Sequence, residues 1–318
     1  MIAILSNALD ATADFFQERL EDRGVAYVRI DTDQLPRITI SHRLSSQLAE
    51  TSLLVEDVEL SLDSLSSIYY RRPKPPDIPE IANAGLKEWI ANEYRKAWGG
   101  ILAGAGKLKW VNHPLAISGA GYKPEQLKRA AQKCLQIPST LITSDPLAAE
   151  RFCRDYEWDV VVKPIGHGEV RGETPESDQL VYTSALEKDQ AGILERVRVC
   201  PTLFQQRIHK ALDLRVTVVE NECIAVALHS QERDISTVDC RRDSMQGMRY
   251  SLYRLPENVA RRLVELTRSY GLYFAAIDMA LDDQGEYVFF EINPAGQWAW
   301  LEEIAGAPIS DALISCLT

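Results

Sequence analysis

Closely spaced cysteines are missing from this sequence: its six cysteines are scattered and form no Cys-x-x-Cys pair. The five histidines are scattered as well, which excludes the usual ligand spacing of a zinc site. No apolar run approaches the ~20 residues that a membrane helix needs, and no charged and apolar leader precedes Met1–Leu5. We therefore expect a reduced, cytoplasmic protein that does not bind a membrane.

An excess of positive charge is also missing. The 318 residues carry 46 acidic and 35 basic side chains, a formal net charge of −11. Such a balance excludes a broad nucleic-acid footprint and favours small molecules or a peptide as partners. With 46% hydrophobic residues, the chain is long enough to form two or three lobes with substantial cores.

Several motifs of nucleotide-binding and hydrolytic enzymes are incomplete or absent. Gly100–Lys107 resembles a P-loop, but five residues instead of four separate its first glycine from Gly106, and Leu108 replaces the magnesium-binding Ser or Thr. Gly119-Ala-Gly121 has no third glycine, which excludes a dinucleotide fingerprint. There is no Gly-x-Ser-x-Gly or His-Glu-x-x-His segment either. A nucleotide would need a different kind of site.

Three oxygen-bearing side chains near the carboxyl end indicate such a site. Glu291 and Asn293 are two residues apart on an apolar run and project from one face of a strand. Asp278 lies on the preceding strand, and a short turn between the strands predicts that Phe289 lies opposite Asp278 with Glu291 diagonally across. Magnesium prefers one or two carboxylates completed by nucleotide phosphates. Solvated or salt-bridged acids remain an alternative from the residue types alone.

Two lysines precede segments that can approach an anion. Lys163 ends an apolar strand before a loop with Gly166 and Gly168, and Lys123 stands before Pro124 at the start of a predicted helix. Either lysine could hold phosphate charge, or could be an ordinary solvated side chain. Further along, Asp213 and Arg215 share one strand face. The Arg215 guanidinium could bind a carboxylate or phosphate through two nitrogens, or the two residues could form a plain ion pair.

The order of predicted elements is typical of an α/β class chain. Strands are expected at Ile2–Ser6 and Val25–Ile30 around a helix at Ala13–Arg23, as in a βαβ unit. From Pro201 onward the pattern is strongly β, so the last part is of the α+β kind. We expect three domains, at residues 1–116, 117–199 and 200–318.

Taken in order, several pieces of the sequence resemble the ATP-grasp ligases: Lys123, Ile137–Thr140, Val162–Lys163, Gln205–Gln206, Asp213–Arg215, Asp278 and Glu291–Asn293. The resemblance covers about Ile117 to Thr318. It implies an ATP-grasp fold, in which two β-rich subdomains clamp ATP and a Rossmann-like pre-ATP-grasp lobe precedes them. ATP and two magnesium ions are then the expected cofactors.

The same resemblance implies a role for each of these residues. Those expected to bind the nucleotide are Lys123, Lys163, Gly166, Gly168, Gln205, Gln206, Arg207, Ile208 and Asp213. The expected metal ligands are Asp278, Glu291 and Asn293. Arg215 and Arg241 are the expected catalytic residues, because they would orient the carboxylate and steady the transferred phosphoryl group.

Four further stretches resemble one branch of this family: Ile68–Pro73, His229–Gln231, Val238–Arg241 and Asn293–Glu302. They are similar to the maturases of microviridin-like peptides, called graspetides. This similarity implies a ribosomally made precursor, with a leader and an acidic core, as the partner. Arg71 and Arg72 would guide the acidic core.

The implied reaction activates an Asp or Glu side chain as an acylphosphate, which a Ser or Thr hydroxyl or a Lys amine then captures as an ω-ester or ω-amide. An ATP-grasp ligase for amino acids or for glutamate on a protein terminus is the alternative. A nucleotide-binding regulator without turnover is a third hypothesis. The sequence does not decide between a monomer and a homodimer.

Overall fold

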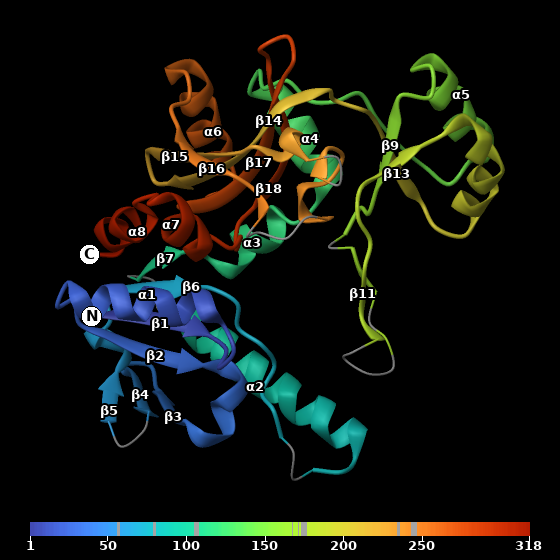
Figure 1. Cartoon of the computed structure of the whole chain (residues 1–318). Coiled ribbons are helices and arrows are strands. Elements are labelled where there is room, and N and C mark those ends of the chain that lie inside the picture. The colour runs from blue at the N-terminus through green and yellow to red at the C-terminus, as the bar shows by residue number, and fades with distance from the viewer. Residues whose placement is uncertain are drawn as a thin grey trace.

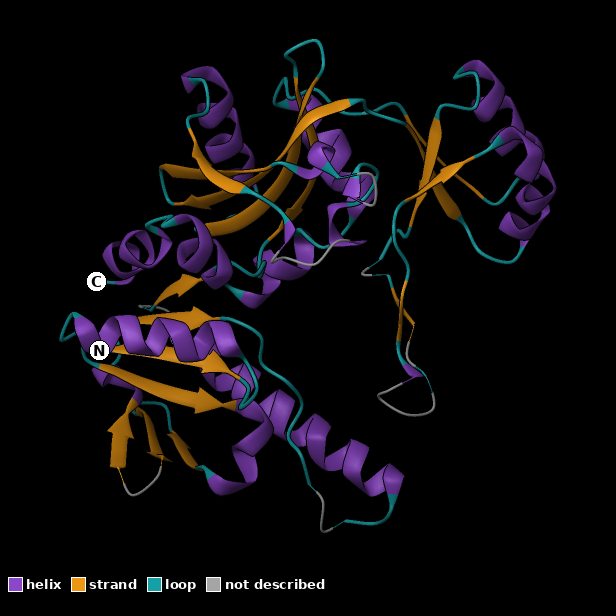
Figure 2. Ribbon diagram, in the orientation of Figure 1, coloured by secondary structure: helices purple, strands orange, loops and turns teal. Residues whose placement is uncertain are grey.

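The computed structural model describes residues 1–55, 58–78, 81–104, 108–166, 168–170, 172, 177–233, 236–242 and 247–318. Figure 1 and Figure 2 show three lobes, each with its own sheet and helices. The predicted mixed α/β class is confirmed. Within the described part of the chain, no helix combines the length and apolarity needed to cross a membrane.

The first lobe is built on a parallel sheet with the strand order β2-β1-β6-β7. Its strands are β1 (Ile2–Ser6), β2 (Tyr27–Asp31), β6 (Ser67–Tyr70) and β7 (Lys109–Val111). Every residue of β1 is buried, as expected for a parallel strand covered on both faces. Ile2 and Ile4 pack with helix α1 (Ala11–Asp22), whereas Ala3 and Leu5 pack with helix α2 (Ala84–Gly104).

A smaller antiparallel sheet completes this lobe and consists of β3 (Thr39–Leu44), β4 (Ala49–Val55) and β5 (Val58–Ser61). Two short 3-10 helices, η1 (Thr32–Arg37) and η2 (Leu62–Ser64), connect it to the parallel sheet. The small sheet lies on the side of the first lobe that faces away from the other two lobes (Figure 1).

The second lobe carries the antiparallel sheet β12-β9-β13-β8. Its strands are β8 (Thr140–Thr143), β9 (Val160–Lys163), β12 (Ser184–Leu186) and β13 (Thr202–Gln206). Helix α5 (Pro146–Asp155) and the 3-10 segment η4 (Lys188–Arg198) cover one face. A hairpin of β10 (Glu169–Val170) and β11 (Gln179–Leu180) extends away from this sheet (Figure 1).

The third lobe is a five-stranded antiparallel sheet with the order β16-β15-β14-β17-β18. Its strands are β14 (Lys210–Val219), β15 (Glu222–Leu228), β16 (Tyr250–Tyr253), β17 (Phe274–Asp282) and β18 (Tyr287–Asn293). Helices α4 (Lys123–Gln132) and α6 (Glu257–Ser269) cover one face, and α7 (Ala299–Ala305) and α8 (Ile309–Leu317) cover part of the other. Helix α3 (Pro114–Gly119) and the short η5 (Ser230–Glu232) and η7 (Cys240–Arg242) complete the lobe.

The first and third lobes share one hydrophobic core. Trp298 is fully buried, its ring packs edge-on against Phe16, and its indole N–H donates to the Tyr69 hydroxyl over 2.8 Å. At the other end of the contact, the Ser67 hydroxyl donates to the Leu317 carbonyl over 2.7 Å. Since buried aromatic groups dominate such contacts, the first lobe is held firmly against the end of β18.

Candidate functional site

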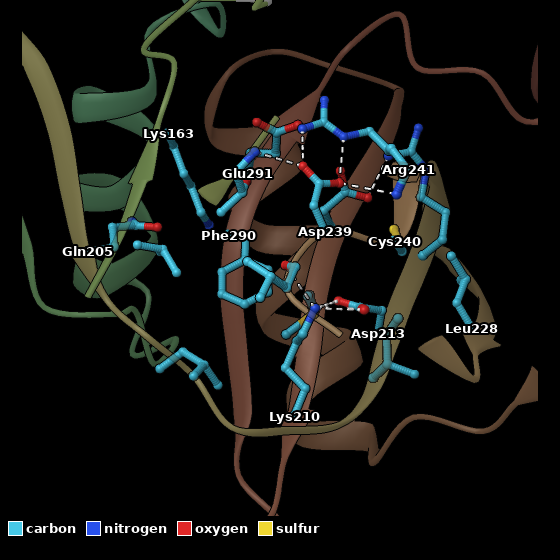
Figure 3. Close-up of a pocket in the computed structure, with 18 of the residues that line it drawn as sticks. Lys163, Gln205, Lys210, Asp213, Leu228, Asp239, Cys240, Arg241, Phe290 and Glu291 are labelled. Atoms are coloured by element: carbon cyan, nitrogen blue, oxygen red, sulfur yellow. Dashed lines mark hydrogen bonds and ion pairs between the residues drawn. The ribbon is translucent and has the colours of Figure 1, made fainter. Parts of the chain in front are cut away.

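A cavity of about 580 Å³ lies between the sheet of the second lobe and the sheet of the third. Figure 3 shows Lys163 and Gln205 on one side of it, with Asp213, Cys240 and Arg241 on the other. The predicted residues that line it are Lys123, Lys163, Gly166, Gln205, Gln206, Arg207, Ile208, Asp213, Arg215, Arg241, Asp278, Glu291 and Asn293. The fold therefore gathers most of the predicted site into one cleft.

The β17–β18 hairpin sets the acidic part of this cleft. Asp278 lies directly opposite Glu291, and Met279 lies opposite Phe289, because a β-bulge interrupts the pairing between them. The prediction that Phe289 lies opposite Asp278 is therefore wrong. The bulge inserts one extra residue, Phe290, which lines the cavity beside Glu291.

The two carboxylates have different charged partners. Lys123 Nζ lies 3.1 Å from Glu291 Oε2, and Arg215 Nη1 lies 2.5 Å from Asp278 Oδ1. Burial raises the pKa of Asp278, Arg215 opposes this rise, and the negative charge of Glu291 adds to it. Burial also acts to raise the pKa of Glu291, but Lys123 and Arg215 outweigh it and lower this pKa.

The oxygen atoms present fit a hard divalent cation. Asp278, Glu291 and Asn293 all line the cavity, and among the residues that the structure describes the Asn293 amide oxygen accepts one hydrogen bond, from the Ala295 N–H at 3.0 Å. Among the described residues, no three His, Cys, Asp or Glu side chains gather as a metal cage. Two carboxylates and an amide suit magnesium, which keeps waters and takes phosphate oxygens as its other ligands.

Of the two predicted phosphate lysines, Lys123 contacts the glycine loop and Lys163 directly precedes it. Lys123, the first residue of α4, donates from Nζ to the Pro164 carbonyl over 3.1 Å. Gly168 has a φ of 73°, and a Cβ there would lie 2.8 Å from both Pro164 Cγ and the Val181 carbonyl oxygen. Only glycine therefore fits at position 168, where the backbone packs closely against Pro164 and Val181.

Lys163, the last residue of β9, points into the cleft and places Nζ 4.4 Å from the centre of the Phe290 ring. Burial lowers its pKa to about 8, and the neighbouring Lys210 and Lys123 add to this effect, whereas Glu291 opposes it. Sequence reasoning did not find the Phe290 contact, because the bulge that creates it leaves no mark in the apolar run.

This pKa predicts how nucleotide affinity depends on pH. Because the ordinary pKa of lysine is 10.5 and burial lowers it to about 8 here, Lys163 loses its proton as the pH rises through 8. Phosphate binds the protonated form, so we expect the Kd for ATP to rise by about tenfold for each pH unit above 8. Calorimetric titration at a series of pH values would measure this slope.

Lys163→Arg provides the control, since a guanidinium stays charged over this range. The slope should disappear in that variant. A slope that persists in Lys163→Arg would show that another group titrates.

The end of β13 and its connection to β14 also border the cleft. Gln205 is 2% exposed and its side-chain amide donates to Thr140 Oγ1 over 3.0 Å. The N–H groups of Gln206 and Arg207 donate to the carbonyls of Ser139 and Asp159. Within the described ranges, no hydrogen bond occupies the N–H of Ile208, so this group remains available to a heterocycle in the cleft.

Lys210 is a site residue that the sequence analysis missed. Its Nζ lies 2.8 Å from Asp213 Oδ2, the Ser230 hydroxyl donates to the same oxygen over 2.5 Å, and both charged side chains line the cavity. Positions three apart do not normally share a face of a strand. A register shift between Lys210 and Leu212 brings the lysine to the side of Asp213.

Arg241 lies on a loop that bridges the second and third lobes. Its guanidinium is held by Asp239 through contacts of 2.9 and 2.6 Å, and Asp239 Oδ2 also accepts the Thr183 N–H at 2.9 Å. Burial acts to raise the pKa of Asp239, but these hydrogen bonds outweigh it and lower the pKa to about 2. Arg242 adds a donation to the Thr183 carbonyl over 3.1 Å. Asp239 thus links the loop that carries Arg241 to Thr183 in the second lobe.

Loss of the hydrogen bond between Asp239 and Thr183 is expected to increase the motion of the second lobe relative to this loop. In Asp239→Ala, the Thr183 amide should exchange its hydrogen about 10- to 100-fold faster, the range expected when a charge-assisted hydrogen bond is lost. Hydrogen exchange measured by mass spectrometry over residues 177–186 would test this. Asp155→Ala, an exposed change in the same lobe, should leave the exchange unchanged, and equal exchange in both variants would contradict the bridging role.

The two arginines predicted to guide a substrate, Arg71 and Arg72, differ in their exposure to solvent. Arg72 is exposed and donates from Nε to the Ala295 carbonyl over 3.2 Å. Arg71 is 2% exposed and contacts the Ala295 carbonyl, Gln297 Oε1 and Asp10. Direct contact with a peptide is therefore open to Arg72 but not to Arg71 in this arrangement.

Comparison with known protein families divides the chain into two parts. The family model described as the MvdD pre-ATP grasp domain matches residues 1–118, and the one described as the RimK-like ATP-grasp domain matches residues 122–317. A search of curated proteins finds no match.

Solved structures match over the whole chain. The macrocyclase MdnC bound with precursor peptide MdnA, from Microcystis aeruginosa MRC, has 28% identity and a TM-score of 0.86, covering 100% of this chain and 99% of its own. A RiPP-associated ATP-grasp ligase of Chryseobacterium gregarium, in complex with ADP and a leader and core peptide, has 26% identity and a TM-score of 0.90, covering 99% and 96%. The macrocyclase MdnB from Microcystis aeruginosa MRC has 28% identity and a TM-score of 0.78, covering 100% and 98%.

The predicted ATP-grasp fold and the resemblance to peptide-modifying members are thus confirmed. The family match spans well over half of the chain and contains the whole cleft. This chain belongs to the RimK-like ATP-grasp family and is an ATP-dependent carboxylate ligase that carries an MvdD-type pre-ATP-grasp domain.

Proposed function

We propose that this chain is a peptide macrocyclase, which uses ATP to join an Asp or Glu side chain of a ribosomally made precursor to a Ser or Thr hydroxyl or a Lys amine. The observation that carries this proposal is the full-length similarity to MdnC and to the Chryseobacterium gregarium ligase, whose structures hold precursor or leader and core peptides. The MvdD-type first lobe supports it further. The domain division at 1–116, 117–199 and 200–318 remains part of the proposal.

We infer that ATP occupies the cleft, with its phosphates toward Lys123 and Lys163 and its base toward Ile208. Asp278, Glu291 and Asn293 would hold two magnesium ions. Bound magnesium supplies charge neutralisation and orientation of the phosphates in such reactions. Lys123, now paired with Glu291, would be free to contact phosphate once a cation took over that carboxylate.

The proposed reaction has two steps. A substrate carboxylate oxygen attacks the γ-phosphorus, the bond to the β-phosphate oxygen breaks, and ADP leaves. The hydroxyl or amine then attacks the acyl carbon, loses its proton to solvent and releases phosphate. Arg215 and Arg241 both line the cleft, and their planar guanidinium groups suit the carboxylate and the acylphosphate.

The peptide would approach from the side of Arg72, the exposed arginine of the first lobe. Its positive charge is suited to an acidic core peptide, whereas the chain as a whole is acidic. A homodimer stays a prediction, and sedimentation equilibrium would test it.

Mass spectrometry tests the proposed function directly. The substrate is the peptide encoded by a short reading frame next to the gene, with a tail rich in Thr and in Asp or Glu. With ATP and Mg²⁺, the peptide should lose the mass of one water molecule per crosslink, together with release of one ADP. A peptide that stays unchanged with the intact enzyme would overturn the proposal.

The same measurement separates the alternative, a ligase that adds amino acids or glutamate to a small molecule or a protein terminus. This alternative draws on the RimK-like match over residues 122–317. Its product would gain mass instead of losing water. ATP uptake without ADP release in the presence of either kind of substrate would indicate a regulator without turnover.

A further inference from the structure

Arg71 carries a charge deep inside the contact between the first and third lobes. It follows β6 directly, and only 2% of its surface is exposed. Asp10, itself 4% exposed, supplies the opposite charge, with 3.6 Å between Arg71 Nε and Asp10 Oδ2. The remaining nitrogens face the third lobe, where Nη2 donates to Gln297 Oε1 over 2.7 Å and Nη1 donates to the Ala295 carbonyl.

On one side, hydrogen bonds from the first lobe and its connection hold the segment from Pro294 to Trp298. The Asn112 amide donates to the Pro294 carbonyl over 2.8 Å, and the Thr12 hydroxyl bonds Gln297 Oε1. Because a carbonyl left without a donor would be costly, these hydrogen bonds favour one path of the backbone here. The first lobe therefore determines the path of the chain directly after Asn293.

The opposite side of this segment touches the site. The Gln297 carbonyl accepts a hydrogen bond from Arg215 Nη2 at 3.3 Å, while Arg215 Nη1 contacts Asp278. A Cβ on Gly296 would lie 2.9 Å from Arg215 Nη2 and 2.3 Å from the Ala276 methyl group. The guanidinium of Arg215 is thus oriented by the segment that Arg71 holds.

These contacts form a continuous chain. Asp10 pairs with Arg71, and Arg71 donates to the side chain of Gln297. The Gln297 carbonyl in turn accepts from Arg215, which pairs with Asp278. Arg72 stands beside this chain of contacts, and partial desolvation of its guanidinium group together with the charge of Arg71 lowers its pKa, although the residue as a whole is exposed. The charges of Arg71 and Arg215 both act to lower the pKa of Arg72, so the arrangement of these like charges depends on the acceptors between them.

We propose that Arg71 and Gln297 form a positioning pair, through which the first lobe sets the orientation of Arg215 beside Asp278. This inference rests on the proposed function, since it uses peptide-dependent ATP turnover as one readout. It assigns to Arg71 a role in placing Arg215, in place of contact with the peptide.

Two mild variants test the pair. Gln297→Ala removes the side-chain contact with Arg71 but leaves the main-chain carbonyl that Arg215 contacts. Arg71→Lys keeps the positive charge beside Asp10 but removes the two guanidinium nitrogens that donate to Ala295 and Gln297. We expect kcat for peptide-dependent ADP release to fall about tenfold or more in each, as small misplacements near a reacting group do. The KM for the precursor should change less than about twofold, because neither residue contacts it.

The double variant and two controls sharpen the test. If the residues act as one unit, Arg71→Lys with Gln297→Ala should be no slower than the slower single variant. Arg154→Lys and Gln284→Ala, exposed changes of the same types, should retain full turnover. If Arg71→Lys does not fold, Gln297→Ala decides alone, because it leaves the buried Arg71–Asp10 pair intact.

A readout without turnover keeps this inference separate from the proposed function. The ¹⁵N-edited side-chain signal of Arg215, identified by its loss in Arg215→Lys, should shift in Gln297→Ala and stay fixed in Gln284→Ala. A folded Gln297→Ala with an unchanged Arg215 signal or full kcat would overturn the positioning pair, as would a rise confined to the KM for the precursor. Absence of turnover in the unaltered enzyme would instead count against the macrocyclase, while the signal would still decide on the pair.

Discussion

Glu291→Ala is expected to reduce ATP turnover by about 10²- to 10³-fold or more, the range seen when a group that stabilises transition-state charge is removed. Glu291 faces Asp278 across the hairpin and forms an ion pair with Lys123. Its loss therefore removes one proposed metal ligand and also displaces Lys123, a proposed phosphate ligand. Coupled-enzyme detection of ADP with saturating ATP, Mg²⁺ and peptide would measure the loss.

The matched control for this change lies on the same hairpin. Glu286→Ala alters an exposed carboxylate outside the cleft and should leave turnover unchanged. Glu291→Gln keeps one neutral oxygen, and its ATP turnover should lie between that of the alanine variant and that of the unaltered enzyme. Full activity in a folded Glu291→Ala would remove the proposed metal site from the mechanism.

The second large effect is expected for nucleotide binding by Lys163→Met. This variant keeps the length and apolar contact of the side chain over Phe290 but removes the charge that the phosphates would meet. We expect the Kd for ATP to rise about 10- to 100-fold, the equivalent of one charge-assisted hydrogen bond. Isothermal titration calorimetry with Mg-ATP at pH 7 would measure it.

Stability provides an independent check on the same residue. Because burial lowers the pKa of Lys163 to about 8, its charge is unfavourable at pH 7 while no anion is bound. Lys163→Met should therefore raise the melting temperature of the nucleotide-free protein, and the gain should vanish when ATP is added. Lys128→Met, an exposed change on α4, should affect neither the Kd nor the melting temperature.

The α/β class and the shared strand face of two cleft residues followed from local patterns, whereas most of the other expected cleft residues followed from the resemblance to the ATP-grasp ligases. Alternation along the chain predicted that Glu291 and Asn293 share a face, and the structure brings both to the cavity with Asp278. The buried strand before Lys163 ends at the predicted residue, Lys163 itself, because a run of valines followed by proline and glycine can be read locally. Their roles toward ATP and magnesium stay predictions until a ligand is bound.

Irregularities of the backbone were beyond such reasoning. The bulge at Phe290 places Glu291 directly opposite Asp278, and the register shift near Lys210 brings that lysine to Asp213. A bulge depends on pairing with a partner strand far away in sequence, so no period within one strand can predict it. The bridge from Asp239 to Thr183 has the same origin, since it joins residues 56 positions apart.

By itself, the order of residues determined an α/β class and a resemblance to the ATP-grasp ligases, which implied that two lysines, two carboxylates and an amide meet a metal-bound nucleotide. Only the tertiary structure decided which charges meet. Arg71 and Arg72 are adjacent in sequence and identical in type, yet one is buried against Asp10 and Gln297 while the other is exposed. The difference arises because the third lobe covers one face of the segment after β6, and burial of a charge depends on what another part of the chain brings to it.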